Sequence, residues 1–84
     1  MYTVIFRPYA EKEYKKLPRN IQIQIRDKLK HYLSTKNPLV FASYLKDSSL
    51  GTYRFRIGDY RVIFDLEENR LIILTLGHRR EIYK

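Results

Sequence analysis

The chain has 84 residues, of which 44% are hydrophobic and 14% aromatic, so we expect one domain with a modest core over residues 1–84. Its 17 Lys and Arg against 9 Asp and Glu give a formal charge of +8, which favours nucleic acid, an acidic protein or an anionic membrane surface as partner. The absence of cysteine excludes disulfides, thiolate zinc sites and a cysteine nucleophile. No apolar run approaches the ~20 residues needed to span a bilayer, so we expect a cytoplasmic protein without a membrane partner.

A short strand and two helices are predicted in the first half of the chain. Residues 2–6 are rich in β-branched and aromatic side chains, which indicates a strand. Apolar residues recur at helical spacing over residues 10–17, and Pro18 ends that helix. The second helix has apolar positions at helical spacing over residues 21–33 and ends before Asn37-Pro38. Because the connection is so short, we expect an antiparallel helix hairpin.

The segment of residues 38–51 has no clear periodicity. Its apolar residues Phe41, Tyr44 and Leu45 are expected to tuck under the sheet. Residues 48–51, Ser-Ser-Leu-Gly, predict a turn.

The hydrophobic period changes from 3.6 to 2 after that turn. Residues 53–57 predict a strand, Gly58-Asp59 a two-residue hairpin loop, and residues 60–66 the return strand. Residues 67–70 predict a second turn, and residues 71–76 an apolar strand buried on both faces. The predicted order β-α-α-β-β-β is an α+β fold, with the helix hairpin packed on a mostly antiparallel four-stranded sheet.

The register of the hairpin follows from its loop. With Gly58-Asp59 as the loop, Ile57 pairs with Tyr60 and Arg56 with Arg61. Alternation then places the aromatic and aliphatic residues on the core face. The other face carries three arginines: Arg54, Arg56 and Arg61.

This arginine face predicts an external anion. Like charges opposite each other in a sheet cost up to about 1 kcal/mol per pair, which a fold rarely accumulates without a role for them. In so basic a chain, the favoured anion is a phosphate backbone. The alternative is a structural ion-pair network in which Asp65 and Glu67 satisfy the arginines.

The end of the chain, residues 77–84, is dense in charged and hydrogen-bonding groups. We expect Gly77 to let the chain kink away from the sheet. If the tail folds back beside the hairpin, the arginine face gains three side chains: His78, Arg79 and Tyr83. The alternative is a frayed basic terminus in which Ile82 and Tyr83 form a hydrophobic latch.

These residue types support one kind of reaction on a phosphate. No metal-ligand spacing, glycine-rich phosphate loop or serine elbow occurs, and His31 and His78 lack supporting ligands, so no metal and no cofactor is expected. RNA carries its own nucleophile, the 2′-hydroxyl. Arginines can bind and neutralise the phosphate, but they stay protonated and cannot act as the base. Proton transfer is left to one of three side chains: His78, Tyr83 or Lys46.

Two segments carry a family resemblance. Residues 53–64, YRFRIGDYRVIF, and residues 77–83, GHRREIY, together closely resemble the RelE/ParE toxin superfamily. The strand that ends at Phe6 and the Lys-Lys-Leu-Pro run of residues 15–18 match as well, so the resemblance covers essentially the whole chain as a single RelE/ParE-like toxin domain. The ending is similar to the RelE-like branch.

The resemblance implies the toxin of a type II toxin–antitoxin module, an endoribonuclease that cleaves mRNA in the ribosomal A site by 2′-hydroxyl attack without metal. It implies a catalytic set of Arg54, Arg61, Arg79 and Tyr83, in which Arg54 stands where the best-studied RelE toxins carry lysine. Further RNA contacts are expected from Lys46, Arg56, His78 and Arg80.

The expected partners are mRNA, the ribosome and a cognate antitoxin with an acidic wrapping segment, and a heterotetramer with the antitoxin is one expected assembly. Two alternatives stay open. One is a ParE-like inhibitor of DNA gyrase without nuclease activity, and the other is a catalytically weak nucleic-acid-binding relative.

Overall fold

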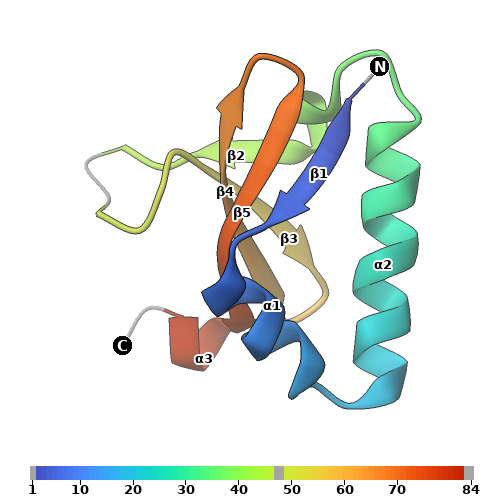
Figure 1. The fold of residues 1–84 in the computed structure, drawn as a ribbon, viewed down its shortest axis with the longest axis vertical. Helices are drawn as coiled ribbons and strands as arrows, with labels where there is room; N and C mark the ends of the chain where they lie inside the picture. Colours follow the sequence, from blue (N-terminus) through green and yellow to red (C-terminus); the bar gives the residue numbers. More distant parts are fainter. Residues whose placement is uncertain (1, 47–48, 83–84) are drawn as a thin grey trace.

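The computed structural model describes residues 2–46 and 49–82, which form an α+β fold of the predicted class (Figure 1). Its first half holds a strand, two helices and a short 3-10 helix: β1 (Thr3–Phe6), α1 (Pro8–Lys15), α2 (Arg19–Leu33) and η1 (Pro38–Phe41). Its second half holds four strands and a last helix: β2 (Ala42–Tyr44), β3 (Tyr53–Ile57), β4 (Tyr60–Glu67), β5 (Arg70–His78) and α3 (Arg79–Ile82).

The sheet has five strands in the order β1-β5-β4-β3-β2, one more than predicted. β1 pairs parallel with β5, and the other neighbours are antiparallel. The missed strand is β2, which pairs with β3 through Ala42 opposite Phe55 and Tyr44 opposite Tyr53. Its three residues carry no alternating pattern, so only the backbone groups at the edge of β3 make them a strand.

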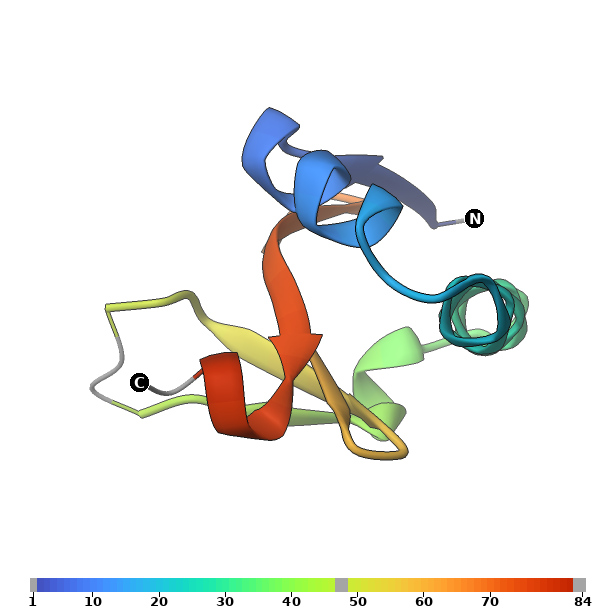
Figure 2. The same cartoon turned by 90° about the horizontal axis from the view of Figure 1, so that it is seen from below.

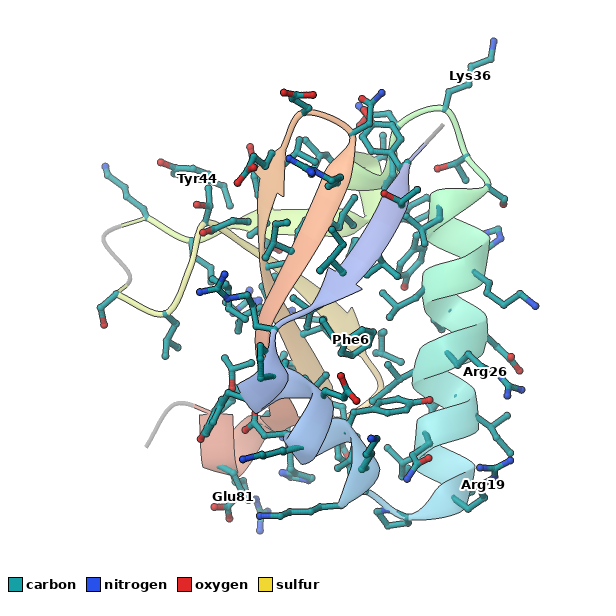
Figure 3. All side chains as sticks on the ribbon, viewed as in Figure 1. Phe6, Arg19, Arg26, Lys36, Tyr44 and Glu81 are labelled. Carbon is teal, nitrogen blue, oxygen red and sulfur yellow. The ribbon has the colours of Figure 1, made fainter. Side chains whose placement is uncertain are left out.

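The expectation that Phe41, Tyr44 and Leu45 tuck under the sheet is wrong for two of them. Phe41 is 40% exposed and Tyr44 is 68% exposed, because Tyr44 belongs to the edge strand β2 and Phe41 directly precedes that strand. Figure 3 shows Tyr44 projecting from this edge. Residues 49–51 of the predicted turn are described, and residue 48 lies outside the described part of the chain.

The two long helices cover different parts of the sheet. α2 lies along one face, where Ile25, Leu29 and Tyr32 are buried, whereas α1 packs on β5. Figure 1 shows the predicted helix hairpin, in which the chain descends through α1 and returns upward through α2, and Figure 2 shows that the two helices are splayed apart. Their junction is held by the Tyr14 hydroxyl, which donates to the Gln22 carbonyl at 2.8 Å.

The core lies between α2 and the sheet and is largely aromatic. The Phe55 and Phe64 rings stack with centroids 4.5 Å apart, and Tyr32 of α2 lies 4.7 Å from Phe55. Phe41 extends the series by stacking on Tyr32 at 4.5 Å. These contacts confirm that the apolar side of the predicted hairpin faces the core.

The opposite face of the sheet is partly covered by the segment of residues 49–52. The Thr52 amide donates to Asp65 Oδ1 at 2.8 Å, and a Cβ added at Gly51 would lie 2.7 Å from Ile63 Cγ2. Ile63, although on this face, is therefore fully buried. The arginine face thus has an apolar neighbour that the hairpin pattern did not predict.

β5 runs longer than predicted, to His78, and Gly77 does not kink the chain. Gly77 stays in the strand, opposite Arg61, and it has no positive φ. The irregularity lies earlier, where the register shifts between Ile63 and Phe64 and leaves Leu74 as the extra residue. Ile72 and Leu74 are half-buried, so the strand is less enclosed than the apolar run suggested.

Candidate functional site

The hairpin between β3 and β4 has the predicted register. Ile57 pairs with Tyr60 and Arg56 with Arg61. Gly58 has a φ of 60°, a conformation that glycine adopts without a Cβ penalty and that the two-residue loop requires. The strand pairing therefore places Arg54, Arg56 and Arg61 on the face opposite the core, as expected.

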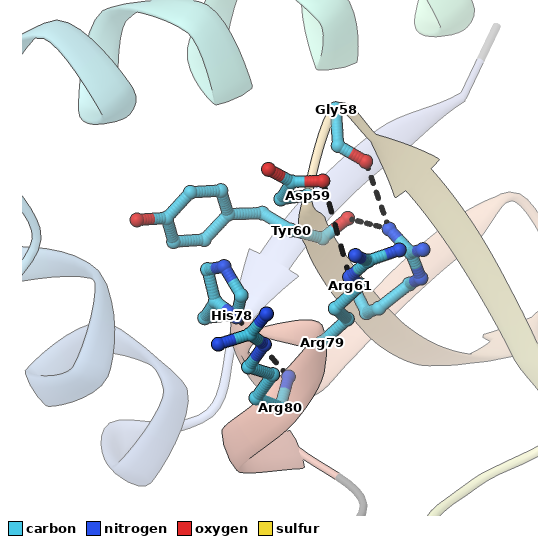
Figure 4. A network of polar contacts seen from close by, with 7 residues as sticks. All are labelled: Gly58, Asp59, Tyr60, Arg61, His78, Arg79 and Arg80. Atoms are coloured by element: carbon cyan, nitrogen blue, oxygen red, sulfur yellow. Dashed lines mark hydrogen bonds and ion pairs between the residues drawn. The ribbon is translucent and has the colours of Figure 1, made fainter.

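The three arginines differ strongly in exposure. Arg61 is only 9% exposed, and its Nη1 donates to the carbonyl oxygens of Gly58 and Tyr60, each at 2.9 Å (Figure 4). Arg56 is exposed, whereas Arg54 is half-buried and its Nε atom is enclosed. The hairpin turn thus holds one guanidinium in a defined position.

The tail folds back onto the same turn. The Arg79 amide donates to the Asp59 carbonyl at 2.8 Å, and Arg79 Nε lies 4.0 Å from Asp59 Oδ1. Residues 79–82 form α3, so over these residues the frayed terminus is not observed. Tyr83, the predicted nucleotide-stacking residue, lies outside the described residues.

His78 stands between the tail and the hairpin. It pairs with Tyr60 across β4 and β5, and the two rings meet edge to face with centroids 5.4 Å apart. Its Nδ1 accepts a hydrogen bond from the Arg80 amide at 3.1 Å. The structure therefore gathers Arg61, His78 and Arg79 around one turn.

The remaining predicted RNA contacts lie outside this network or at its edge. Lys46 is exposed in the loop that follows β2, and the Arg80 side chain is exposed on α3. The carboxylates of the predicted ion-pair network have other partners: Asp65 accepts from the Thr52 amide, and Glu67 pairs with Arg70 at 2.9 Å.

Sequence reasoning missed the residues that organise the turn. The sequence pattern predicts Asp59 only as a loop residue, yet it contacts Arg79 through both its carbonyl and its carboxylate. The same pattern predicts Tyr60 only as a core residue, yet its carbonyl holds Arg61 and its ring contacts His78. The Tyr60 and His78 pairing would follow from the sequence only if the full length of β5 were known.

The arrangement suits an anionic ligand that carries phosphate. Guanidinium groups match phosphate oxygens with paired N–H donors, and imidazole is a side chain that exchanges protons near neutral pH. Among the described residues, no group of three or more His, Asp or Glu side chains is placed to hold a metal ion. Nor is any helix in the described part long and apolar enough to cross a membrane.

Known proteins are similar to this chain in sequence and in fold. The model of a family described as the ParE toxin of the type II toxin–antitoxin system parDE matches residues 4–83. Toxin RelG of Mycobacterium tuberculosis (strain ATCC 25618 / H37Rv) is 33% identical over 85 residues, which span 99% of this chain and 97% of that protein.

Solved toxin structures show the same similarity. The RelBE2 toxin–antitoxin complex of Mycobacterium tuberculosis contains a chain that is 30% identical and superposes with a TM-score of 0.80, covering 93% of this chain and 98% of that one. The isolated E. coli RelE toxin, at 22% identity, shares the fold with a TM-score of 0.72 over 99% of this chain and 92% of its own. The chain therefore belongs to the RelE/ParE superfamily and is a toxin of the type II toxin–antitoxin class.

Proposed function

We propose that this toxin is an endoribonuclease that acts in the cytoplasm and cleaves mRNA in the ribosomal A site without a metal ion. The observation that carries the proposal is the position of Arg61, which two backbone carbonyls hold beside the turn that also binds Arg79. Fixed donors of this kind stabilise charge that develops in a transition state without reorganising. The similarity to Toxin RelG supports the toxin role on which this proposal builds.

In the proposed reaction, the 2′-oxygen of one nucleotide attacks the adjacent phosphorus and the 5′-oxygen leaves. The products are a 2′,3′-cyclic phosphate and a 5′-hydroxyl. Arg61 and Arg79 would hold the phosphate oxygens. Arg54, on the same face of the sheet as Arg61, would add a further positive charge. A base takes the 2′ proton and an acid protonates the 5′-oxygen.

The other predicted residues have supporting roles. Tyr83 would stack on or orient the nucleotide. The proposed groups for proton transfer are Tyr83 and Lys46. Further contacts to the RNA would come from Arg56, His78 and Arg80. Arg56 lies on the arginine face, whereas His78 is paired with Tyr60 on the other face, at the end of the sheet where α3 begins.

Primer extension on mRNA in a translating extract tests this function. Wild-type toxin should produce new 5′ ends within codons, and Arg61→Ala should remove both these ends and the growth arrest. Arg70→Ala is the matched control, because Arg70 pairs with Glu67 on the surface, at the opposite end of β5 from His78. Expressed wild-type toxin that leaves mRNA intact would refute a ribonuclease.

A second candidate function is inhibition of DNA gyrase without nuclease activity. It is favoured by the family model, whose description names the ParE toxin and which spans residues 4–83. Gyrase supercoiling assays separate the two functions, since a gyrase inhibitor blocks supercoiling while translation continues. A toxin that affects neither process, nor growth, would be a non-catalytic nucleic-acid-binding relative.

We also propose that the antitoxin presents an acidic segment with apolar anchors. An apolar groove of about 170 Å³ lies between β1 and α2, lined by Val4, Phe6, Tyr14, Leu29 and Leu33. Its rim carries Arg26 and Lys30, and Figure 3 shows Arg26 projecting outward from α2. Arg26→Glu should slow association with the antitoxin and weaken its dependence on salt, and an unchanged rate would place the acidic segment elsewhere.

A further inference from the structure

α3 is too short to be stable by itself. It has four residues, and isolated helices of this length do not form in water, because nucleation costs more than so few hydrogen bonds return. The first N–H groups of any helix also lack partners within it. In this toxin, the first two are bonded outside the helix: the Arg79 amide to the Asp59 carbonyl at 2.8 Å, and the Arg80 amide to His78 Nδ1 at 3.1 Å.

His78 therefore occupies the N-cap position of α3. It directly precedes Arg79, and its side chain accepts from the second N–H of the helix, a bond that Ser, Thr, Asp or Asn usually provides. A ring nitrogen that accepts a hydrogen bond carries no proton. The hydrogen-bond geometry thus assigns the neutral ring a proton on Nε2.

Tyr60 supports the same ring and links it to Arg61. The Tyr60 and His78 rings meet at an interplanar angle of 80°, while the Tyr60 carbonyl accepts from Arg61 Nη1 at 2.9 Å. Asp59, which directly precedes Tyr60, accepts a hydrogen bond from the Arg79 amide through its carbonyl. Movement of His78 would therefore disturb the start of α3 and the position of Arg79 together.

We propose that His78 is a positioning residue: through Nδ1 it caps α3 and sets Arg79 beside the hairpin turn, and it takes no part in proton transfer. As a base, the ring would accept a proton on Nδ1 and lose the Arg80 bond. As an acid in its neutral form, it would have to release its single proton and become an anion. The capping role stands on the geometry alone, and the role of Arg79 toward RNA rests on the proposed ribonuclease function.

NMR of the full-length toxin tests the cap without any activity assay. In ¹⁵N-labelled protein, His78 Nδ1 should resonate as a bare ring nitrogen and Nε2 as a protonated one. His78→Ala should lower the hydrogen-exchange protection of the Arg80 amide by about five-fold, the usual effect of losing an N-cap. His78→Asn, which keeps an acceptor, should restore that protection. A proton on Nδ1, or unchanged protection in His78→Ala, would overturn the cap.

Single-turnover mRNA cleavage then separates positioning from proton transfer. His78→Ala should slow cleavage roughly ten-fold or more, because a displaced Arg79 loses its alignment. His78→Asn, which cannot exchange a proton, should recover most of the rate. His31→Asn is the control for replacing an exposed histidine elsewhere and should cleave like wild type.

The two proposals fail in different ways. If His78→Asn preserves the protection of Arg80 but stays as slow as His78→Ala, His78 transfers protons and the positioning role is wrong. If wild-type toxin does not cleave mRNA, the ribonuclease function is wrong, and the NMR measurements still decide whether His78 caps α3.

Discussion

Arg56 and Arg61 lie directly opposite each other on β3 and β4, yet their surroundings differ. Arg56 is exposed to solvent, whereas Arg61 is 9% exposed and bonds to the carbonyls of Gly58 and Tyr60. Opposed like charges destabilise a sheet by up to about 1 kcal/mol, and hydrogen bonds from a charged donor offset that cost. The turn thereby keeps Arg61 in a position that strand pairing alone disfavours.

This difference predicts unequal effects of replacing the two arginines with lysine. Lysine keeps the charge but lacks the planar fork, so Arg61→Lys cannot bond the turn and a phosphate in the same way. We expect it to lower single-turnover mRNA cleavage by about 100-fold, as the loss of a fixed transition-state donor does. Arg56→Lys should cost only a few-fold. Equal losses for both variants would contradict a special role for Arg61.

Gly51 should tolerate no side chain. An added Cβ would lie 2.7 Å from Ile63 Cγ2 and 2.9 Å from Leu74 Cδ1, and Ile63 is fully buried and cannot yield easily. Gly51→Ala should therefore lower the free energy of unfolding by about 1–3 kcal/mol in urea denaturation. Gly77→Ala is the matched control, since its Cβ would meet Ile82 Cδ1 at 3.9 Å, and we expect a change within about 0.5 kcal/mol. Similar values for both would argue against close packing at Gly51.

Glu13 completes the edge of the sheet beyond the end of β1. The pairing of β1 with β5 ends at Phe6 and Ile73, and Glu13 Oε1 then accepts from Thr75 Oγ1 at 2.6 Å and from the Leu76 amide at 3.0 Å. Glu13→Ala should reduce the free energy of unfolding by about 1–3 kcal/mol, because both donors lose their acceptor. Glu13→Gln keeps an oxygen acceptor and should cost clearly less. A Gln variant as unstable as the Ala variant would mean that the charge, not the acceptor, matters.

Burial of Tyr32 should make the fold sensitive to alkaline pH. Burial raises the pKa of Tyr32 above its ordinary value of 10.0, because ionisation is disfavoured in the core. Below pH 10 the tyrosine is protonated in both states, so its burial does not make the free energy of unfolding depend on pH. As the pH rises above 10 and through the higher pKa of the folded state, the unfolded state ionises first and the free energy of unfolding falls. Thermal unfolding between pH 8 and 12 should show a flatter decline for Tyr32→Phe than for wild type. Tyr44→Phe is the control, since the Tyr44 side chain is 68% exposed, and it should follow the wild-type curve.

The hairpin was predictable because two independent signals agree there. A period of 2 defines the strands, and Gly58-Asp59 defines the loop, so every pair from Ile57 and Tyr60 outward follows by counting. β2 was not predictable, because Ala-Ser-Tyr carries no such period and becomes a strand only by pairing with β3. The kink expected at Gly77 was wrong because pairing with β4 continues through Gly77 to His78.

The sequence by itself determined the α+β class, the superfamily, the hairpin register and the face on which three arginines gather. These properties depend on local periodicity, turn chemistry and motif, which are written along the chain. Only the tertiary structure decided that Arg61 is buried against its own turn, that Asp59 binds Arg79, and that His78 caps α3. The contact of Asp59 with Arg79 joins segments twenty residues apart, whereas the bonds of Arg61 and His78 are local. The geometry of all three depends on how β4, β5 and α3 pack together, which no local pattern encodes.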